Sequence, residues 1–95
     1  MSDSDITMVI NDPLVLFTVV YTAGGTGVTG LPRHETLLDH SMYTISHKVP
    51  KRPGYRFIGW MASFGRICQP GQHLVISSRN VVLIAQWKRE DSYSL

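Results

Sequence analysis

Apolar and polar residues alternate in several short stretches of this 95-residue chain, and glycine or proline interrupts the pattern between most of them. Alternation with a period of two predicts β-strands, because successive side chains of a strand point to opposite faces. The clearest run covers residues 14–22, and further strands are predicted at 55–62, 74–76 and 81–87. The last of these is apolar on both faces, which is typical of a strand inside a sheet. The sequence therefore predicts a mainly β protein.

Large apolar side chains fall on one face of each long predicted strand. Strict alternation places Trp60 on the opposite face from Tyr55 and Phe57. A β-bulge at Gly59 would reset this parity and turn Trp60 inward. We expect one core that contains Phe17, Val19, Tyr21, Tyr55, Phe57, Trp60, Leu83 and Trp87.

Residues 31–47 admit two interpretations. Pro32 could begin a helix, because proline is tolerated in the first helical turn. Alternatively, 35–38 and 42–46 form the strands of a hairpin that turns through Asp39, His40 and Ser41. The strand-forming residues of the second segment favour the hairpin over the helix.

Length and composition indicate one domain with short tails. The chain is 43% hydrophobic and 17% charged, and no apolar run approaches the ~18 residues of a membrane-spanning helix. We expect a tail at 1–13 with a short β-prone patch (Ile6–Ile10), a domain at 14–88 and a second tail at 89–95. The first residues are acidic, whereas a secretory signal begins with basic residues. The sequence thus predicts a cytoplasmic protein or a piece of a longer one.

Basic residues are concentrated in the predicted domain. Residues 13–88 carry eight Lys and Arg against two acids. Four of the eight lie within nine residues: Lys48, Lys51, Arg52 and Arg56. Because prolines interrupt this segment, we expect a semi-rigid loop whose side chains project into water. It is the candidate contact for an acidic ligand such as a sulfated glycan or an acidic protein, and the alternative is a solvated loop without a partner.

Few residues of the sequence indicate catalysis. The one cysteine, Cys68, reads as a small packed side chain, and its pairing with His73 as nucleophile and base is the weaker alternative. The four histidines lack the spacing of a metal site. Residues 25–30 match G-x-G-x-x-G, but no helix is predicted after them and no acid lies at 46–54 to bind a ribose. We therefore predict no catalytic residues, no metal and no cofactor.

The order of these segments resembles the Listeria–Bacteroides repeat, or internalin B-repeat, family. The resemblance rests on a Phe-Thr-Val-Val-Tyr strand with a glycine-rich loop, on Arg-Pro-Gly-Tyr-Arg-Phe-Ile-Gly-Trp, and on a closing Ala-Gln-Trp. It covers about 17–88. Ile84 departs from the family's usual Tyr, and Asp39-His40 stands where a turn glycine is common.

The resemblance implies a small β-grasp-like twisted mixed sheet, with the helix of that fold reduced or absent. In such a sheet, 17–21 would pair in parallel with 81–87. The family further implies a non-enzymatic spacer or interaction module of bacterial surface or secreted proteins, usually in tandem. The main alternative is a basic module for an acidic partner or nucleic acid, although no specific nucleic-acid motif is present.

Overall fold

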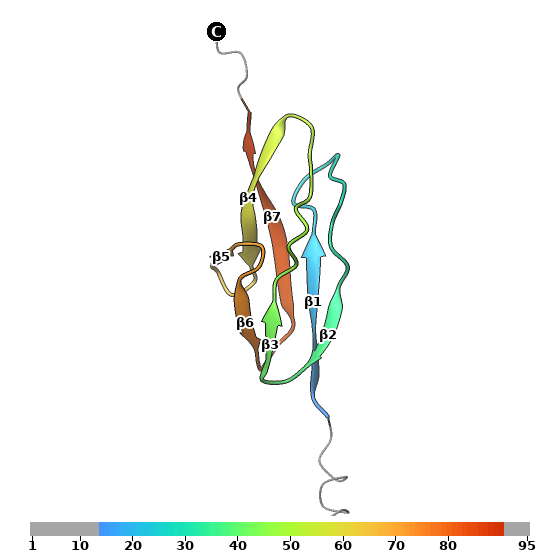
Figure 1. Cartoon of the computed structure of the whole chain (residues 1–95), viewed down its shortest axis with the longest axis vertical. Coiled ribbons are helices and arrows are strands. Elements are labelled where there is room, and N and C mark those ends of the chain that lie inside the picture. Colours follow the sequence, from blue (N-terminus) through green and yellow to red (C-terminus); the bar gives the residue numbers. More distant parts are fainter. Residues whose placement is uncertain (1–13, 91–95) are drawn as a thin grey trace, which may run out of the picture.

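The computed structural model describes residues 14–90, which form seven β-strands and, within that range, no helix (Figure 1). The predicted tail at 1–13 and most of that at 89–95 lie outside the described residues. The observed strands differ from the predicted ones at several ends: the first begins at Leu16 rather than at residue 14, the segment predicted at 42–46 is a strand at Ser41–Thr44, the strand predicted at 74–76 begins at His73, and the last strand continues to Arg89. A further strand, too short to show alternation, lies at 67–68. The strands are β1 (Leu16–Thr22), β2 (Glu35–Leu38), β3 (Ser41–Thr44), β4 (Tyr55–Ala62), β5 (Ile67–Cys68), β6 (His73–Ile76) and β7 (Val81–Arg89).

Five strands form a mixed sheet in the order β2-β1-β7-β4-β5. Strands β1 and β7 are parallel neighbours, with Val19 opposite Val81 and Thr22 opposite Ile84. The other neighbours in this sheet are antiparallel. The mainly β, β-grasp-like class is confirmed, as are the parallel pairing of the first and last strands and the central position of β7.

The segment at 35–44 is extended, as predicted, but it is not a hairpin. Strand β2 pairs with β1, whereas β3 pairs with β6 in a separate two-stranded sheet. The reason lies in the turn between them. The Asp39 N–H donates to the Val15 carbonyl and the His40 N–H donates to the Ile76 carbonyl. Two successive backbone groups thus bond to different sheets, and the chain changes layer at this turn.

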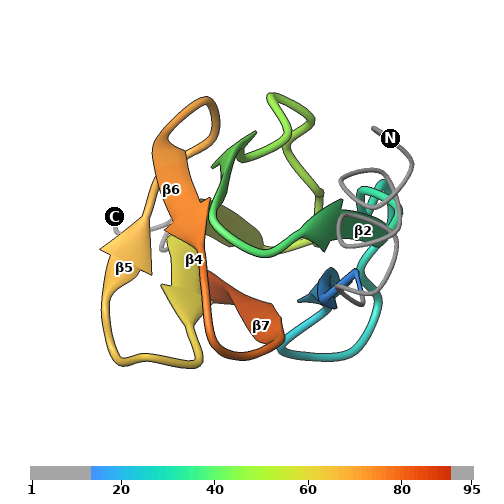
Figure 2. The same cartoon turned by 90° about the horizontal axis from the view of Figure 1, so that it is seen from below.

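The two sheets face each other and enclose the core (Figure 2). Trp60 lies at its centre, fully buried, with its ring 4.9 Å from that of Tyr21 and 5.0 Å from that of Phe57, both edge-on. Of the predicted core residues, all but Tyr55 are buried in this cluster or packed against it. The buried members of the core cluster are Val19, Tyr21, Tyr43, Ile45, Trp60, Ala62, Cys68, Ile76, Val81, Leu83 and Ala85.

The predicted bulge in β4 is confirmed. The pairing of β4 with β7 shifts register between Phe57 and Gly59, so that both Phe57 and Trp60 face the core. Gly59 has a φ of 143°, and a Cβ at this position would lie 2.8 Å from the Cγ2 of Ile67. Only glycine fits here without displacing β5.

Two tyrosines connect the layers. The hydroxyl of Tyr21 on β1 hydrogen-bonds that of Tyr43 on β3, and it also accepts the Ser46 N–H at 3.0 Å. Burial raises the pKa of Tyr43, and the hydrogen bond to Tyr21 adds to the shift. Tyr43 therefore takes part in this link between the sheets as a neutral phenol.

Residues 14–90 contain no helix long and apolar enough to cross a membrane.

Candidate functional site

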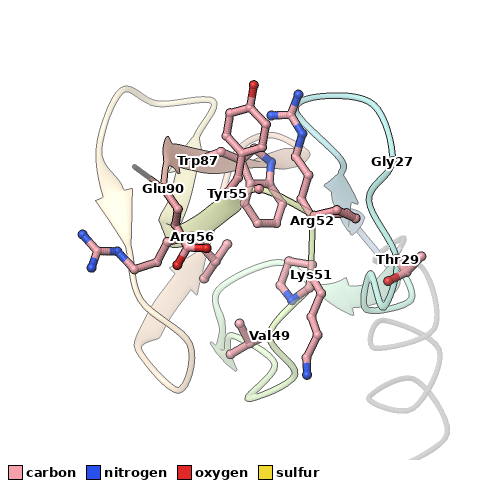
Figure 3. A pocket seen from close by; sticks show the side chains of 13 residues that line it. Gly27, Thr29, Val49, Lys51, Arg52, Tyr55, Arg56, Trp87 and Glu90 are labelled. Atoms are coloured by element: carbon pink, nitrogen blue, oxygen red, sulfur yellow. The ribbon is translucent and has the colours of Figure 1, made fainter. Parts of the chain in front are cut away.

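A pocket of about 600 Å³ opens at the end of the molecule where β4 begins and β7 ends (Figure 3). Its walls come from three parts of the chain: the loop 49–54, the start of β4, and the end of β7. The glycine-rich loop after β1 adds Gly27 and Thr29. We call it the end pocket.

The end pocket is built by loops that are tied to one another and to the sheet. Thr29 and Lys51 exchange two backbone hydrogen bonds of 2.9 Å, which join the glycine-rich loop to the loop 49–54. Gly24 fixes the first loop on β7, since a Cβ there would lie 2.1 Å from the Ala85 carbonyl oxygen. Gly24 thus allows a close approach of the loop backbone to the sheet.

Arg52 is held in place from two sides. Its Nε donates to the Thr26 carbonyl at 3.0 Å, and its guanidinium carbon lies 3.7 Å from the centre of the Tyr55 ring. The guanidinium also lies against Gly25, where a Cβ would approach it to 2.6 Å. A cation over an aromatic face is attracted by the negative face of the ring. Arg52 is accordingly half-buried, whereas the prediction had it projecting freely into water.

Aromatic rings form the wall of the end pocket nearest the core. Phe57 and Trp87 lie opposite each other on β4 and β7, and their rings meet edge-on at 5.7 Å. The indole N–H of Trp87 donates to the Ala23 carbonyl at 2.8 Å, which fixes the ring. Tyr55, which the sequence places in the core, is half-buried at this wall instead. It lies at the start of β4, where its ring packs under Arg52 rather than in the core cluster.

Positive charge surrounds these rings. Lys51 and Arg56 are exposed, and Glu90 is the one acid that lines the pocket. In Figure 3 the charged ends of Lys51 and Arg56 extend away from that of Arg52. The ion pair found within residues 14–90 joins His40 and Asp39. Lys51, Arg52 and Arg56 therefore form no ion pair within that range.

Three of the four predicted contact residues line the end pocket. They are Lys51, Arg52 and Arg56, while Lys48 is exposed but does not line it. The sequence did not indicate that Trp87, Phe57 and Glu90 would join them. Trp87 and Glu90 come from the far end of the chain, so only the antiparallel pairing of β4 with β7 brings them to this loop.

The remaining candidate groups lie elsewhere. Cys68 is a fully buried core side chain, as predicted, and burial raises the pKa of its thiol. His73 is exposed, and its Nδ1 pairs with the Thr44 hydroxyl at 2.9 Å across the small sheet. His34, His40 and His47 are also exposed. Within the described range, no three His, Cys, Asp or Glu side chains gather as metal ligands would.

Comparisons with protein-family models, with curated proteins and with solved structures found no match to this chain.

Proposed function

We propose that this protein is a non-enzymatic interaction module whose end pocket binds an acidic ligand. One observation carries the proposal: Lys51, Arg52 and Arg56 surround an aromatic wall, and no acid of residues 14–90 pairs with them. Cations without an ion pair beside half-buried rings that line a pocket give an anionic ligand both charge attraction and apolar contact.

The absence of catalysis in this proposal is supported by the state of the candidate nucleophile. A thiolate attacks, and a thiol does not. The thiol of Cys68 is buried and its pKa is raised, so the neutral form predominates at neutral pH. A thiol in this state is a poor nucleophile, which argues against a catalytic pairing of Cys68 with His73.

We expect binding at the end pocket to be weak and sensitive to salt. Lys51 and Arg56 are exposed, and charges in water are screened over a distance of about 8 Å at physiological ionic strength. Most of the discrimination must therefore come from Arg52 and the aromatic wall, which are shielded from water in part.

A second role, that of a spacer, is favoured by the direction of the chain. Strands β1 and β7 are parallel, so the described chain enters at one end of the molecule and leaves at the other (Figure 1). Copies joined in series would then extend in line, as the resemblance to B-repeats implies. By the same resemblance, the module would belong to a bacterial surface or secreted protein.

The proposed binding is tested by two charge reversals that change the net charge equally. Lys51→Glu with Arg56→Glu removes the exposed cations of the end pocket. Arg66→Glu with Arg79→Glu removes two exposed cations that do not line it. On a heparin column we expect the first variant to elute at clearly lower salt than the second. Equal elution of the two would show that the column detects net charge alone, and would contradict the proposal.

A further inference from the structure

Arg52 has free hydrogen-bonding capacity at a fixed position. A guanidinium has five N–H donors. Of these, the Nε–H bonds the Thr26 carbonyl, and within residues 14–90 neither terminal nitrogen forms a hydrogen bond. The Tyr55 ring supports the guanidinium plane at 3.7 Å. Such a fork is oriented before a ligand arrives, so little side-chain entropy is lost on binding.

The cations of the end pocket do not converge on one point. The ammonium of Lys51 and the guanidinium of Arg56 extend away from Arg52 (Figure 3). One anionic group at Arg52 therefore meets a single fork rather than a cluster of charges. Two parallel N–H···O bonds match the two oxygens of a carboxylate.

Glu90 limits the charge that the end pocket accepts. Glu90 belongs to the pocket lining, and its backbone N–H donates to the Gly54 carbonyl at 3.0 Å, which places the residue beside the loop that holds Arg52. A ligand with closely spaced negative charges would bring one of them near this carboxylate and be repelled. A ligand with one negative charge and neutral neighbours avoids the repulsion.

Much of the rest of the end pocket is apolar. Val49 is 47% exposed and Pro53 is exposed, and they lie with the half-buried Phe57 and Trp87 in the same lining. Apolar side chains beside a carboxylate would cover these residues and release water from them. Densely sulfated glycans carry no such groups.

Resting on the proposed function, we infer that the end pocket recognises a peptide segment in which one Asp or Glu is flanked by apolar residues. The carboxylate accepts two hydrogen bonds from the terminal nitrogens of Arg52. The apolar neighbours contact the wall formed by Phe57, Trp87 and Pro53. Lys51 and Arg56 attract the segment from outside without fixing it.

The experiment compares matched probes by NMR titration of the isotope-labelled chain. The first probe is acetyl-Leu-Glu-Leu-amide, and the second is its neutral counterpart acetyl-Leu-Gln-Leu-amide. Methyl glucuronide, a sugar with one carboxylate, is the third. We expect the Glu peptide to bind about tenfold more tightly than the Gln peptide, since hydrogen bonds to a charged group are lost in the latter. The glucuronide should bind more weakly than the Glu peptide.

Two variants separate the fork from charge. Arg52→Lys keeps the charge and removes the paired donors, and we expect about a tenfold rise in the Kd of the Glu peptide. Arg66→Lys, at an exposed position outside the pocket, should leave that Kd within about twofold.

Equal binding of the Glu and Gln peptides would overturn the inference, and this comparison requires no variant. Binding of the glucuronide as tight as that of the Glu peptide would overturn the peptide assignment while leaving an acidic ligand in the end pocket. If no probe binds but heparin retention still depends on Lys51 and Arg56, the inference fails and the proposed function stands. Loss of both effects would end both proposals.

Discussion

The guanidinium of Arg52 bonds the Thr26 carbonyl and covers the Tyr55 ring, whereas Lys48, in the same basic segment, is exposed and lies outside the end pocket lining. Composition and spacing place both in one candidate contact surface. The difference arises from the glycine-rich loop, which approaches Arg52 closely because Gly25 has no side chain. The hydrogen bond from Arg52 to Thr26 joins residues 26 positions apart in sequence, so it leaves no local signal. The sequence therefore predicted that basic side chains gather in this segment, but not which of them line the pocket or how each is held.

Tyr43 provides a prediction on pH. Burial and the hydrogen bond to Tyr21 raise its pKa in the folded protein, while in the unfolded chain it ionises near pH 10. Above that pH the unfolded state binds fewer protons than the folded state, so stability must fall as pH rises. The loss due to this group approaches about 1.4 kcal/mol per pH unit. Urea unfolding between pH 9 and 11 measures it.

Tyr43→Phe is the control for this prediction. It removes the titrating hydroxyl and leaves Tyr21 its hydrogen bond from Ser46. Above pH 10 the free energy of unfolding of the variant should fall less steeply with pH, by the slope that one proton gives, about 1.4 kcal/mol per pH unit. An identical slope in both proteins would show that Tyr43 does not titrate with unfolding.

Strands and turns could be predicted unequally well. The three strands of seven or more residues, β1, β4 and β7, were predicted to within two residues of their observed ends. The bulge at Gly59 was also predicted. The partners of β2 and β3 were wrong, because a four-residue strand gives no information about which edge it joins. The outcome depends on Asp39 and His40, whose N–H groups bond to different sheets. Strand β5, with two residues, shows no period at all.

The bulge in β4 makes a prediction through Gly59. Gly59→Ala adds a Cβ 2.8 Å from Ile67 Cγ2 at a φ of 143°. Gly65→Ala is the matched control, because Gly65 also has a positive φ, 91°, but nothing lies within 4 Å of the added carbon. Both variants should be destabilised by backbone strain, about 1–3 kcal/mol, and Gly59→Ala by a further clash.

Thermal unfolding distinguishes the two glycine variants. A difference of 1 kcal/mol shifts the Tm of a domain of this size by about 4–8 °C. We expect Gly59→Ala to melt at least about 4 °C below Gly65→Ala. Equal melting temperatures would mean that β5 does not pack against the bulge.

At the scale of the whole molecule, the resemblance to B-repeats predicted the parallel pairing of β1 with β7 at the middle of the sheet. This pairing determines which ends of the strands lie together. Antiparallel β4 beside β7 then brings Tyr55 and Phe57 to the end where Trp87 lies. The end pocket follows from this topology together with the loop 49–54. Sequence reasoning found the basic half of the pocket, which is contiguous, and missed the aromatic half, which pairing assembles.

The two tryptophans allow a direct test of where an acidic ligand binds. Trp87 lines the end pocket, and Trp60 is fully buried in the core, so their indole N–H signals report on site and core separately. We would titrate the isotope-labelled protein with acetyl-Leu-Glu-Leu-amide, which carries one negative charge, and follow both signals. Binding at the end pocket predicts that the Trp87 signal shifts, together with the amides of 49–57, while the Trp60 signal stays nearly constant. Shifts confined to residues outside the end pocket, with the Trp87 signal unchanged, would contradict it.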